Sequence, residues 1–306
     1  MDNQSETRDF LATRRAKITP EQAGLPVYGG NRRVPGLRRG EVAILAGVSV
    51  EYYTRLERGN LSGVSEGVLE ALARALQLDE AERAHLFDLA RAASSSRKPQ
   101  RRRATAQPVR ASVQVLLDAI TNAPAFVRNG RLDILAANQL GYALYSEMYA
   151  SPVRPANHAR FIFLDKRSFG FYPDWDRAAN DTVAILRTEA GRDPYDRGLT
   201  DLVGELSTRS EEFRTRWAAH NVRQHYTGIK HLRHPVVGDL HLMYEALDLS
   251  ADAGLSLLVY TAEPGSAAED AVRLLASWAA TQQSETQQAG TQQSATTQSG
   301  PAPHQQ

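Results

Sequence analysis

The chain has 306 residues, a length typical of two domains, and 42% of them are hydrophobic, which is enough to form packed cores. It contains no cysteine, which excludes disulfides and cysteine-ligated zinc sites. The formal net charge of +1 is unevenly distributed, because residues 1–110 hold 19 basic and 13 acidic side chains and the rest of the chain holds 17 and 22. A basic first third is expected of a part that meets a polyanion.

Neither a membrane span nor a secretion signal is expected. No apolar run approaches the roughly 18 residues that a membrane helix needs. The first fifteen residues are polar and charged, without the continuous apolar stretch of a signal peptide. The predicted location is therefore the cytoplasm.

Composition divides the chain into four parts. Residues 1–93 have the pattern of short capped helices, and residues 94–110 form a basic linker rich in Ser, Pro and Arg. Residues 111–280 mix helical periodicity with strand-like alternation. Residues 281–306 are rich in Gln, Thr and Ser, a composition typical of disorder. The predicted fold is multidomain, with an all-α N-terminal domain, an α+β C-terminal domain and a disordered tail.

The helices of the first part are indicated by apolar spacing and by capping residues. Thr19, Pro20 and Gln22 have the pattern of a helix start, and Asp79 with Glu82 forms a second capping box. The helical patterns cover, in chain order, residues 10–17, 37–46, 50–58, 65–76 and 79–93.

The stretch RRGEVAILAGVSVEYYTRLERGN has the spacing of a helix-turn-helix. Ala43 is small enough for the second helix to pack closely across the first. Gly47 tolerates the left-handed backbone of a tight turn, and Val48 fills the angle between the helices. Tyr53 and Leu56, three residues apart, face the core. The alternative interpretation is two surface helices joined by a glycine turn, but the agreement of all these positions favours DNA binding.

The remaining side chains of the second helix can enter the major groove of DNA. Arg55 can donate two hydrogen bonds to guanine, and Glu51 can accept one from cytosine. Thr54 and Val50 can touch a thymine methyl group. The candidate DNA-binding residues, including those placed to meet phosphate, are Arg38, Arg39, Ser49, Val50, Glu51, Thr54, Arg55 and Asn60.

Two further charged features near this motif have alternative roles. Arginines 101–103 of the linker either add affinity for any DNA sequence or belong to a solvated spacer. Glu57 is expected to be structural, steadying the loop after Gly59 by a hydrogen bond or an ion pair.

The second part alternates strands and helices. The runs AFVR and RLDIL flank Asn129-Gly130, which predicts a two-residue hairpin turn. Five strands joined by hairpins, with helices between the second and third, predict an antiparallel five-stranded sheet with helices on one face. The expected later elements are helices 174–190 and 199–219, strands 223–232, 239–247 and 255–261, and a closing helix 267–280.

These stretches resemble a known family. The run GLRRGEVAILAGVSVEYYTRLERG is similar to the Cro/repressor (XRE) class of helix-turn-helix, and with VLEALARALQLDEAERAHLFDLA it resembles the MmyB-type regulators. Gly40 departs from the glutamate typical of that class. PAFVRNGRLDILAAN and GIKHLRHPVVGDLHLMYEAL resemble the family's PAS-like ligand-binding domain. The resemblance implies a transcriptional regulator with no cofactor, whose effector is a fatty acid or a similar apolar metabolite.

A helix-covered sheet can enclose an apolar cavity for such a ligand. Aromatic residues would line it, and a basic side chain would hold a carboxylate, although an aromatic residue in such a domain more often belongs to the core. The candidate ligand-binding residues are Phe126, Tyr142, Phe163, Trp175, Trp217, His220, Arg223 and His234. Histidines 225, 231, 234 and 241 lie on neighbouring predicted strands, but no carboxylate or cysteine stands at ligand spacing, so no metal site is predicted.

The expected partners are double-stranded DNA with a two-fold symmetric operator, a small apolar ligand and a second copy of the chain, with no membrane. One alternative is a DNA-binding regulator whose second domain only dimerises. A fused enzyme is disfavoured, because the chain has no GxSxG, Walker A, HExxH or dinucleotide-binding fingerprint.

Overall fold

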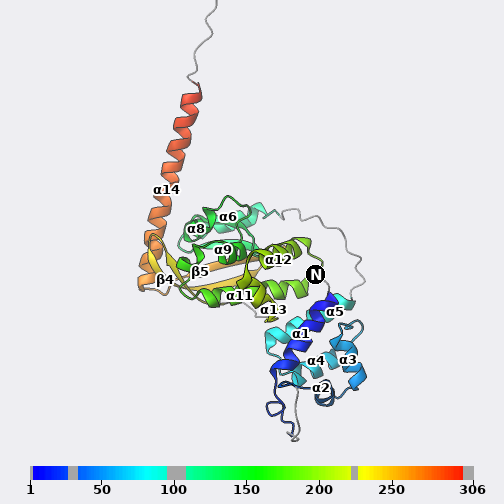
Figure 1. Ribbon diagram of the computed structural model, residues 1–306. Coiled ribbons are helices and arrows are strands. Elements are labelled where there is room, and N and C mark those ends of the chain that lie inside the picture. Colours follow the sequence, from blue (N-terminus) through cyan, green and yellow to red (C-terminus); the bar gives the residue numbers. More distant parts are fainter. Residues whose placement is uncertain (1–2, 27–33, 95–107, 222–226, 299–306) are drawn as a thin grey trace, which may run out of the picture.

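The computed structural model describes residues 3–26, 34–94, 108–221 and 227–298. Within these residues the chain forms an N-terminal bundle of short helices and a C-terminal sheet with helices around it (Figure 1). Most of the predicted linker, including arginines 101–103, lies outside the described residues. None of the helices in the described ranges is long and apolar enough to cross a membrane.

The N-terminal domain is all-α, as predicted, and buried apolar residues of every helix form its core. Its helices are α1 (Asn3–Lys17), α2 (Arg39–Ala46), α3 (Val50–Glu57), α4 (Glu66–Ala75) and α5 (Glu80–Ser94). The first helix begins well before the predicted position 10. The first turns of α1 carry buried polar residues such as Glu6, whose partners lie on other elements. Because these residues are not apolar, apolar spacing did not predict that the helix begins so early.

Thr19 and Gln22 bond to each other through side chain and backbone as a capping pair does, but the segment is a turn and not a helix. At Gly59 the chain passes directly against α1. A Cβ atom there would lie 2.4 Å from the Gln4 carbonyl oxygen, and φ is +97°. Only glycine tolerates both conditions, which lets α3 pack closely on α1.

The C-terminal domain contains the predicted antiparallel five-stranded sheet, in the order β2-β1-β5-β4-β3. Every neighbouring pair is antiparallel. The strands are β1 (Ala125–Asn129), β2 (Ile134–Ala137), β3 (Thr227–His234), β4 (Gly238–Asp248) and β5 (Leu255–Thr261). The hairpin of β1 and β2 begins the domain, and β3, β4 and β5 follow much later in the sequence. The two groups of strands join where β1 pairs with β5.

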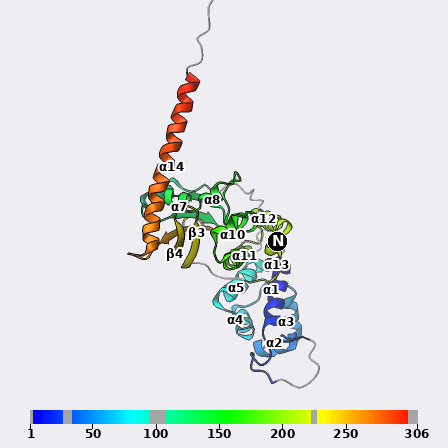
Figure 2. The same ribbon diagram turned by 60° about the vertical axis from the view of Figure 1, so that its left-hand side comes forward.

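Helices cover both faces of this sheet, so the expectation of helices on one face is wrong. The main core joins the sheet to α7 through α13 and to α14, which lies beside β4 (Figures 1 and 2). On the other face, Val113 and Leu117 of α6 pack against Val127 and Leu257. The short helices are α6 (Ala111–Ala119), α7 (Gln139–Leu144), α8 (Ser146–Tyr149), α9 (His158–Leu164) and α10 (Ser168–Phe171).

The longer helices differ from their predicted limits. They are α11 (Trp175–Arg192), α12 (Arg197–Arg209), α13 (Glu211–Ala218) and α14 (Ala267–Gln298). The single helix expected at 199–219 is two helices, because Ser210 has an extended backbone and its side chain accepts a hydrogen bond from the Phe213 amide. The final helix was expected to end near position 280, but it continues to Gln298. Glutamine, the commonest residue there, is a good helix former.

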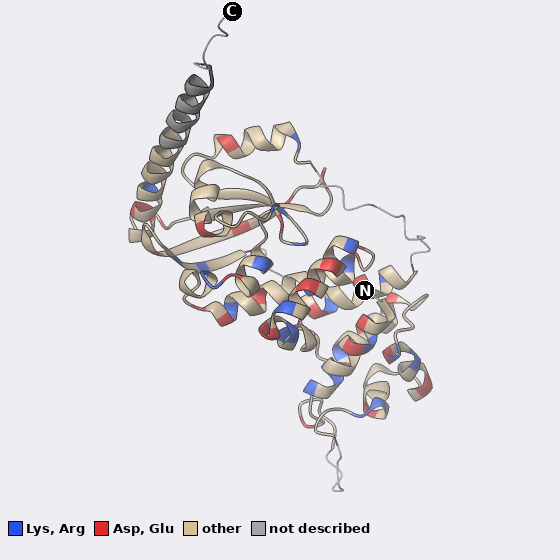
Figure 3. Ribbon diagram, turned by 45° about the horizontal axis from the view of Figure 1, so that its top comes forward, with Lys and Arg blue, Asp and Glu red and all other residues tan. Residues whose placement is uncertain are grey.

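Charged residues lie mainly on the helices, and the strands carry few of them (Figure 3). This distribution follows from burial, since both faces of the sheet are covered and a charged side chain there requires a partner. Arg128 on β1 and Lys230 on β3 are exceptions inside the domain.

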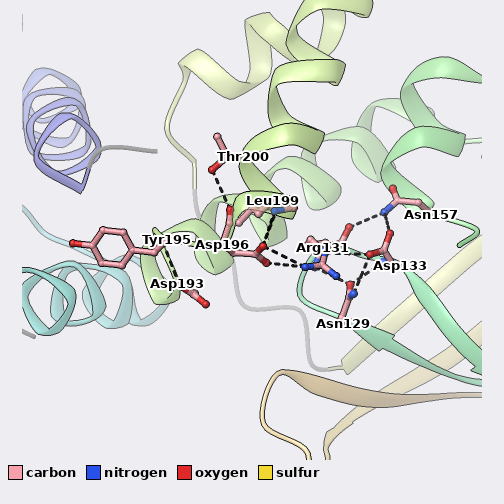
Figure 4. A network of polar contacts seen from close by, with 10 residues as sticks. Asn129, Arg131, Asp133, Asn157, Asp193, Tyr195, Asp196, Leu199 and Thr200 are labelled. Atoms are coloured by element: carbon pink, nitrogen blue, oxygen red, sulfur yellow. Dashed lines mark hydrogen bonds and ion pairs between the residues drawn. The ribbon is translucent and has the colours of Figure 1, made fainter. Parts of the chain in front are cut away.

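The turn between β1 and β2 is not the predicted two-residue Asn-Gly turn. The Asn129 side chain accepts hydrogen bonds from the amides of Arg131 and Asp133, both at 3.0 Å. Leu132 has the positive φ of 65° and is buried, so a longer loop anchored by an apolar residue replaces the tight turn. Arg131 bonds to Asp133 and to Asp196, the N-cap of α12, at 3.2 Å in each case, which ties the hairpin to the helical layer (Figure 4).

Candidate functional site

The α2-turn-α3 unit has the local geometry of a helix-turn-helix. Gly47 has a left-handed backbone with φ of +66°. The Val48 amide donates to the Ala43 carbonyl at 3.0 Å and closes the turn. Ser49 caps α3, because its hydroxyl accepts a hydrogen bond from the Tyr52 amide at 3.0 Å. The angle between α2 and α3 is therefore fixed by local bonds.

One side of α3 is buried and the other is exposed, as a recognition helix requires. Tyr53 and Leu56 are completely buried. Glu51 and Arg55 are exposed, as is Val50 at the start of the helix, while the other predicted base-contacting residue, Thr54, is partly exposed. The Arg55 guanidinium lies 5.3 Å from the centre of the Tyr52 ring. Ser49 and Asn60 are also exposed at the two ends of the helix.

Of the two arginines predicted to contact phosphate at the start of α2, one has a side chain that is ion-paired within the protein and the other has an exposed side chain. Arg39 pairs with Glu57, and its hydrogen bond to that carboxylate raises the pKa of Arg39. Arg15 of α1 donates to the other oxygen of Glu57 at 2.7 Å, so this buried carboxylate joins three helices. The Arg38 amide donates to Glu41 at 2.6 Å. The Arg38 side chain is exposed.

The predicted ligand-binding aromatic residues are not gathered around one cavity. Phe126 is fully buried, with ring contacts to Tyr145 and Tyr260. Phe163 and Trp175 pack edge to face, with their ring centres 5.9 Å apart. These are core contacts, which any large apolar side chain of a packed domain makes.

The other candidate ligand-binding residues lie at the surface or at the boundary with the N-terminal helix-turn-helix domain, which we call the head. Tyr142 is 48% exposed on α7. Trp217 and His220 lie where the two domains meet. His234 is buried, and its Nε2 atom lies 3.0 Å from the Ala143 carbonyl oxygen, which is a structural contact. Arg223 lies outside the described residues.

Two neighbouring cavities lie between the sheet and α11. The inner cavity has a volume of about 40 Å³, and the outer pocket, which opens to solvent, has about 300 Å³. Arg128 and Ile185 line both. The inner cavity is lined by Arg128, Leu132, Tyr145, His158, Ile162, Tyr172, Ala178, Asp181, Thr182, Ile185, Lys230, Tyr244, Leu258 and Tyr260. Apolar residues of the outer pocket are Ile185, Ala246, Leu249, Ala253 and Leu255.

Two family profiles match the chain. A family profile described as an MmyB-like transcription regulator ligand binding domain matches residues 109–275. A second profile, described as a helix-turn-helix domain, matches residues 9–86. The chain belongs to the MmyB-like transcription regulators. It is a ligand-responsive regulator that binds DNA through the helix-turn-helix and a small molecule through the C-terminal domain. No significant match was found among curated proteins.

The inner cavity of this MmyB-like regulator is lined by basic side chains and tyrosine hydroxyls. Burial, together with the charges of Arg128 and Lys230, lowers the pKa of His158 to about 3, so its imidazole is neutral. The Tyr145 and Tyr260 hydroxyls lie 2.9 Å apart. Burial raises the pKa of both, so both retain their protons.

The sequence interpretation did not select these residues. Arg128 follows Phe126 at the spacing of two that places strand side chains on one face, and that face is buried under helices. This alternation was a usable signal for Arg128. His158, Tyr145 and Lys230 come from α9, α7–α8 and β3, and nothing local in the sequence joins them.

No group of three or more His, Cys, Asp or Glu side chains placed to hold a metal occurs in the part of the chain that the structure describes. His231 and His241 stack, with their ring centres 4.1 Å apart, and His231 lies 3.4 Å from Asp239.

A second polar cluster joins the head of the MmyB-like regulator to its ligand-binding domain. Glu6 of α1 pairs with Arg187 of α11, and His220 and His85 lie 3.5 Å and 3.8 Å from its carboxylate. Arg14 donates to the His220 carbonyl. Burial alone would raise the pKa of Glu6, but the nearby His220 and His85 imidazoles and the charge of Arg187 outweigh burial and lower it. We call these five residues the domain-interface cluster.

Proposed function

We propose that this MmyB-like regulator acts in the cytoplasm as a homodimer on a two-fold symmetric operator, with an XRE-type head and without enzymatic activity. The exposed face of α3, with Glu51, Thr54 and Arg55, supports base reading. Helix-turn-helix dimers place their recognition helices about 34–36 Å apart, one turn of DNA. Arg38, Ser49 and Asn60 are exposed around this face and meet phosphate.

We further propose that the effector is a fatty acid or a similar apolar metabolite, bound between the sheet and α11. The observation that carries this proposal is the inner cavity in the domain core, which shares Arg128 and Ile185 with a larger neighbouring pocket. A ligand whose body occupies the outer pocket can direct one end toward these shared residues.

The route from ligand to DNA runs through α11. Asp181, Thr182 and Ile185 of this helix line the inner cavity. Arg187, on the same helix, pairs with Glu6 of the head. A ligand that binds one position of α11 better than another therefore changes how firmly the head is held, and ligand and DNA affinities become coupled.

The first test is native mass spectrometry of the purified protein, followed by organic extraction of any bound molecule. We expect a co-purified acyl chain or similar acid that is released on denaturation. Added back to protein stripped of ligand, it should change the affinity for operator DNA in a gel-shift titration. Binding without any change in DNA affinity would contradict the proposed regulation.

One observation favours a second candidate function, a C-terminal domain that only dimerises. The inner cavity, at about 40 Å³, is far smaller than the roughly 300–1,000 Å³ of common ligand pockets. A ligand-free dimer that fails to take up added fatty acids would support this alternative. DNA binding by the head would be unaffected by that outcome.

A further inference from the structure

Arg128 is the only charged residue shared by both cavities. It lies on β1 directly after the register shift between Val127 and Arg128, opposite Ser256 of β5. Its side chain is partly exposed, and it lines both the inner cavity and the outer pocket. A guanidinium at this junction is reachable by a ligand that enters through the outer pocket.

No hydrogen bond or ion pair holds the Arg128 guanidinium among the residues that the structure describes. Although the residue is partly exposed, its surroundings are apolar enough for burial to lower its pKa, and an arginine in such surroundings is normally paired. The neighbouring cation, Lys230, has a partner of its own, since its Nζ atom lies 3.2 Å from the Asp181 carboxylate. The inner cavity thus holds two positive side chains and one negative one, an excess of a single positive charge.

The neutral groups around Arg128 can donate hydrogen bonds to an anion. The protonated Tyr145 and Tyr260 hydroxyls bond to each other, so one of their two protons remains to donate to an anion. His158 is buried, and its Nδ1 atom has no hydrogen-bond partner within the described part of the chain. A buried polar atom without a partner costs free energy, and a bound anion accepting from it would remove that cost.

We propose that Arg128 is the anion-binding residue of this domain and holds the carboxylate of a monoanionic organic acid. The inference rests on the proposed ligand-sensing function and adds the ligand's charge and orientation. The excess of one positive charge matches one carboxylate, and a planar guanidinium can bond both carboxylate oxygens. The acid enters with its charged end first, and its apolar body lies against Ile185 and Leu249 in the outer pocket.

The test compares ligand binding by the full-length protein and its variants. Calorimetric titrations use a series of straight-chain carboxylates from butanoate to dodecanoate, each with its matching primary alcohol. The wild type should prefer at least one acid over its alcohol by about 10- to 100-fold, the usual effect of hydrogen bonds to a charged group. Arg128→Gln should lose this preference, and Arg128→Lys should keep part of it.

Two controls separate ligand binding from a structural role. Arg167→Gln removes an arginine that is paired with Asp165 and lines neither cavity, so it should leave the acid preference unchanged. Without ligand, Arg128→Gln should unfold at the same or a higher temperature than the wild type, because it removes an unpaired charge. A structural arginine would instead lower the unfolding temperature.

The inference is overturned if the wild type binds the alcohols as tightly as the acids, or if Arg128→Gln keeps the acid preference. It is also overturned if none of the carboxylates binds. In each case the ligand-sensing function is judged separately, by whether the molecule extracted from the purified protein changes its DNA affinity.

Discussion

Arg55 lies on the exposed face of α3, and its guanidinium is near the Tyr52 ring, with no ion pair to any residue that the structure describes. Stacking of this kind orients a long side chain at little cost. Arg39, by contrast, is held by Glu57, and its charge is partly used inside the head. At the scale of single residues, the two arginines are therefore expected to differ in how they meet DNA.

Arg55→Ala should weaken binding to the cognate operator by about 1–3 kcal/mol and relax selectivity at one base pair, because a bidentate contact to guanine is lost. Competition gel shifts with single-base operator variants measure both effects. Arg58→Ala is the matched control, since it removes the same charge from the exposed end of α3. An equal loss on random DNA would show that Arg55 contacts phosphate and does not read a base.

At the scale of elements, α2 carries a glycine that its structure does not require. Gly40 is helical, and a Cβ atom there would come no closer than 4.0 Å to Val50 Cγ2, an ordinary contact. Gly40→Ala should raise the free energy of unfolding by about 0.4–1 kcal/mol, mainly by restricting the unfolded chain. Urea denaturation followed by circular dichroism measures the change.

Gly59→Ala is the contrasting variant, with the same substitution and the opposite expected sign. Its positive φ and its contact with the Gln4 carbonyl force a displacement of α1 or α3. We expect a loss of more than about 1 kcal/mol. Equal effects of the two substitutions would contradict the packing of α3 on α1.

At the scale of the whole molecule, the domain-interface cluster makes stability depend on pH. The pKa of Glu6 is lowered in the folded protein, so its stabilising contribution is complete above the unfolded value of about 4.3 and is lost as the pH falls below it. His85, His220 and Arg187 are the charged or titratable groups that face this carboxylate.

Acidification from pH 6 to pH 3.5 should therefore destabilise the wild type more than Glu6→Gln, whose side chain does not titrate. Urea midpoints of the two proteins across this range test the prediction. Parallel loss in both proteins would show that Glu6 does not carry the acid sensitivity.

Arg187 connects the same cluster to the ligand cavity. Arg187→Met leaves the Glu6 carboxylate buried without its charged partner, which should cost about 3–5 kcal/mol. Adding Glu6→Gln should recover part of that loss, and a double-mutant cycle measures the coupling. The double variant should bind ligand as the wild type does, yet show a smaller ligand-dependent change in DNA affinity. An unchanged response would indicate a route that does not use α11.

Prediction from sequence succeeded where the determining contacts are local. The helix-turn-helix depends on Gly47, on the Ser49 cap and on core positions three residues apart, all within one short stretch. The five strands were also predicted, because their alternation is visible along the chain. The β1–β2 turn was wrong, because the Asn129 side chain and the buried Leu132 select a longer loop than the Asn-Gly pair indicates.

Residues close together in the chain were enough to predict a helix-turn-helix domain followed by a ligand-binding domain, the order of most elements and the exposed face of α3. Which residues line the cavity, and how the head is held, depends on tertiary packing. Arg128, His158 and Lys230 meet there, and Glu6 meets Arg187, because separate strands and helices pack together. Contacts between residues so far apart leave no periodic trace in the sequence.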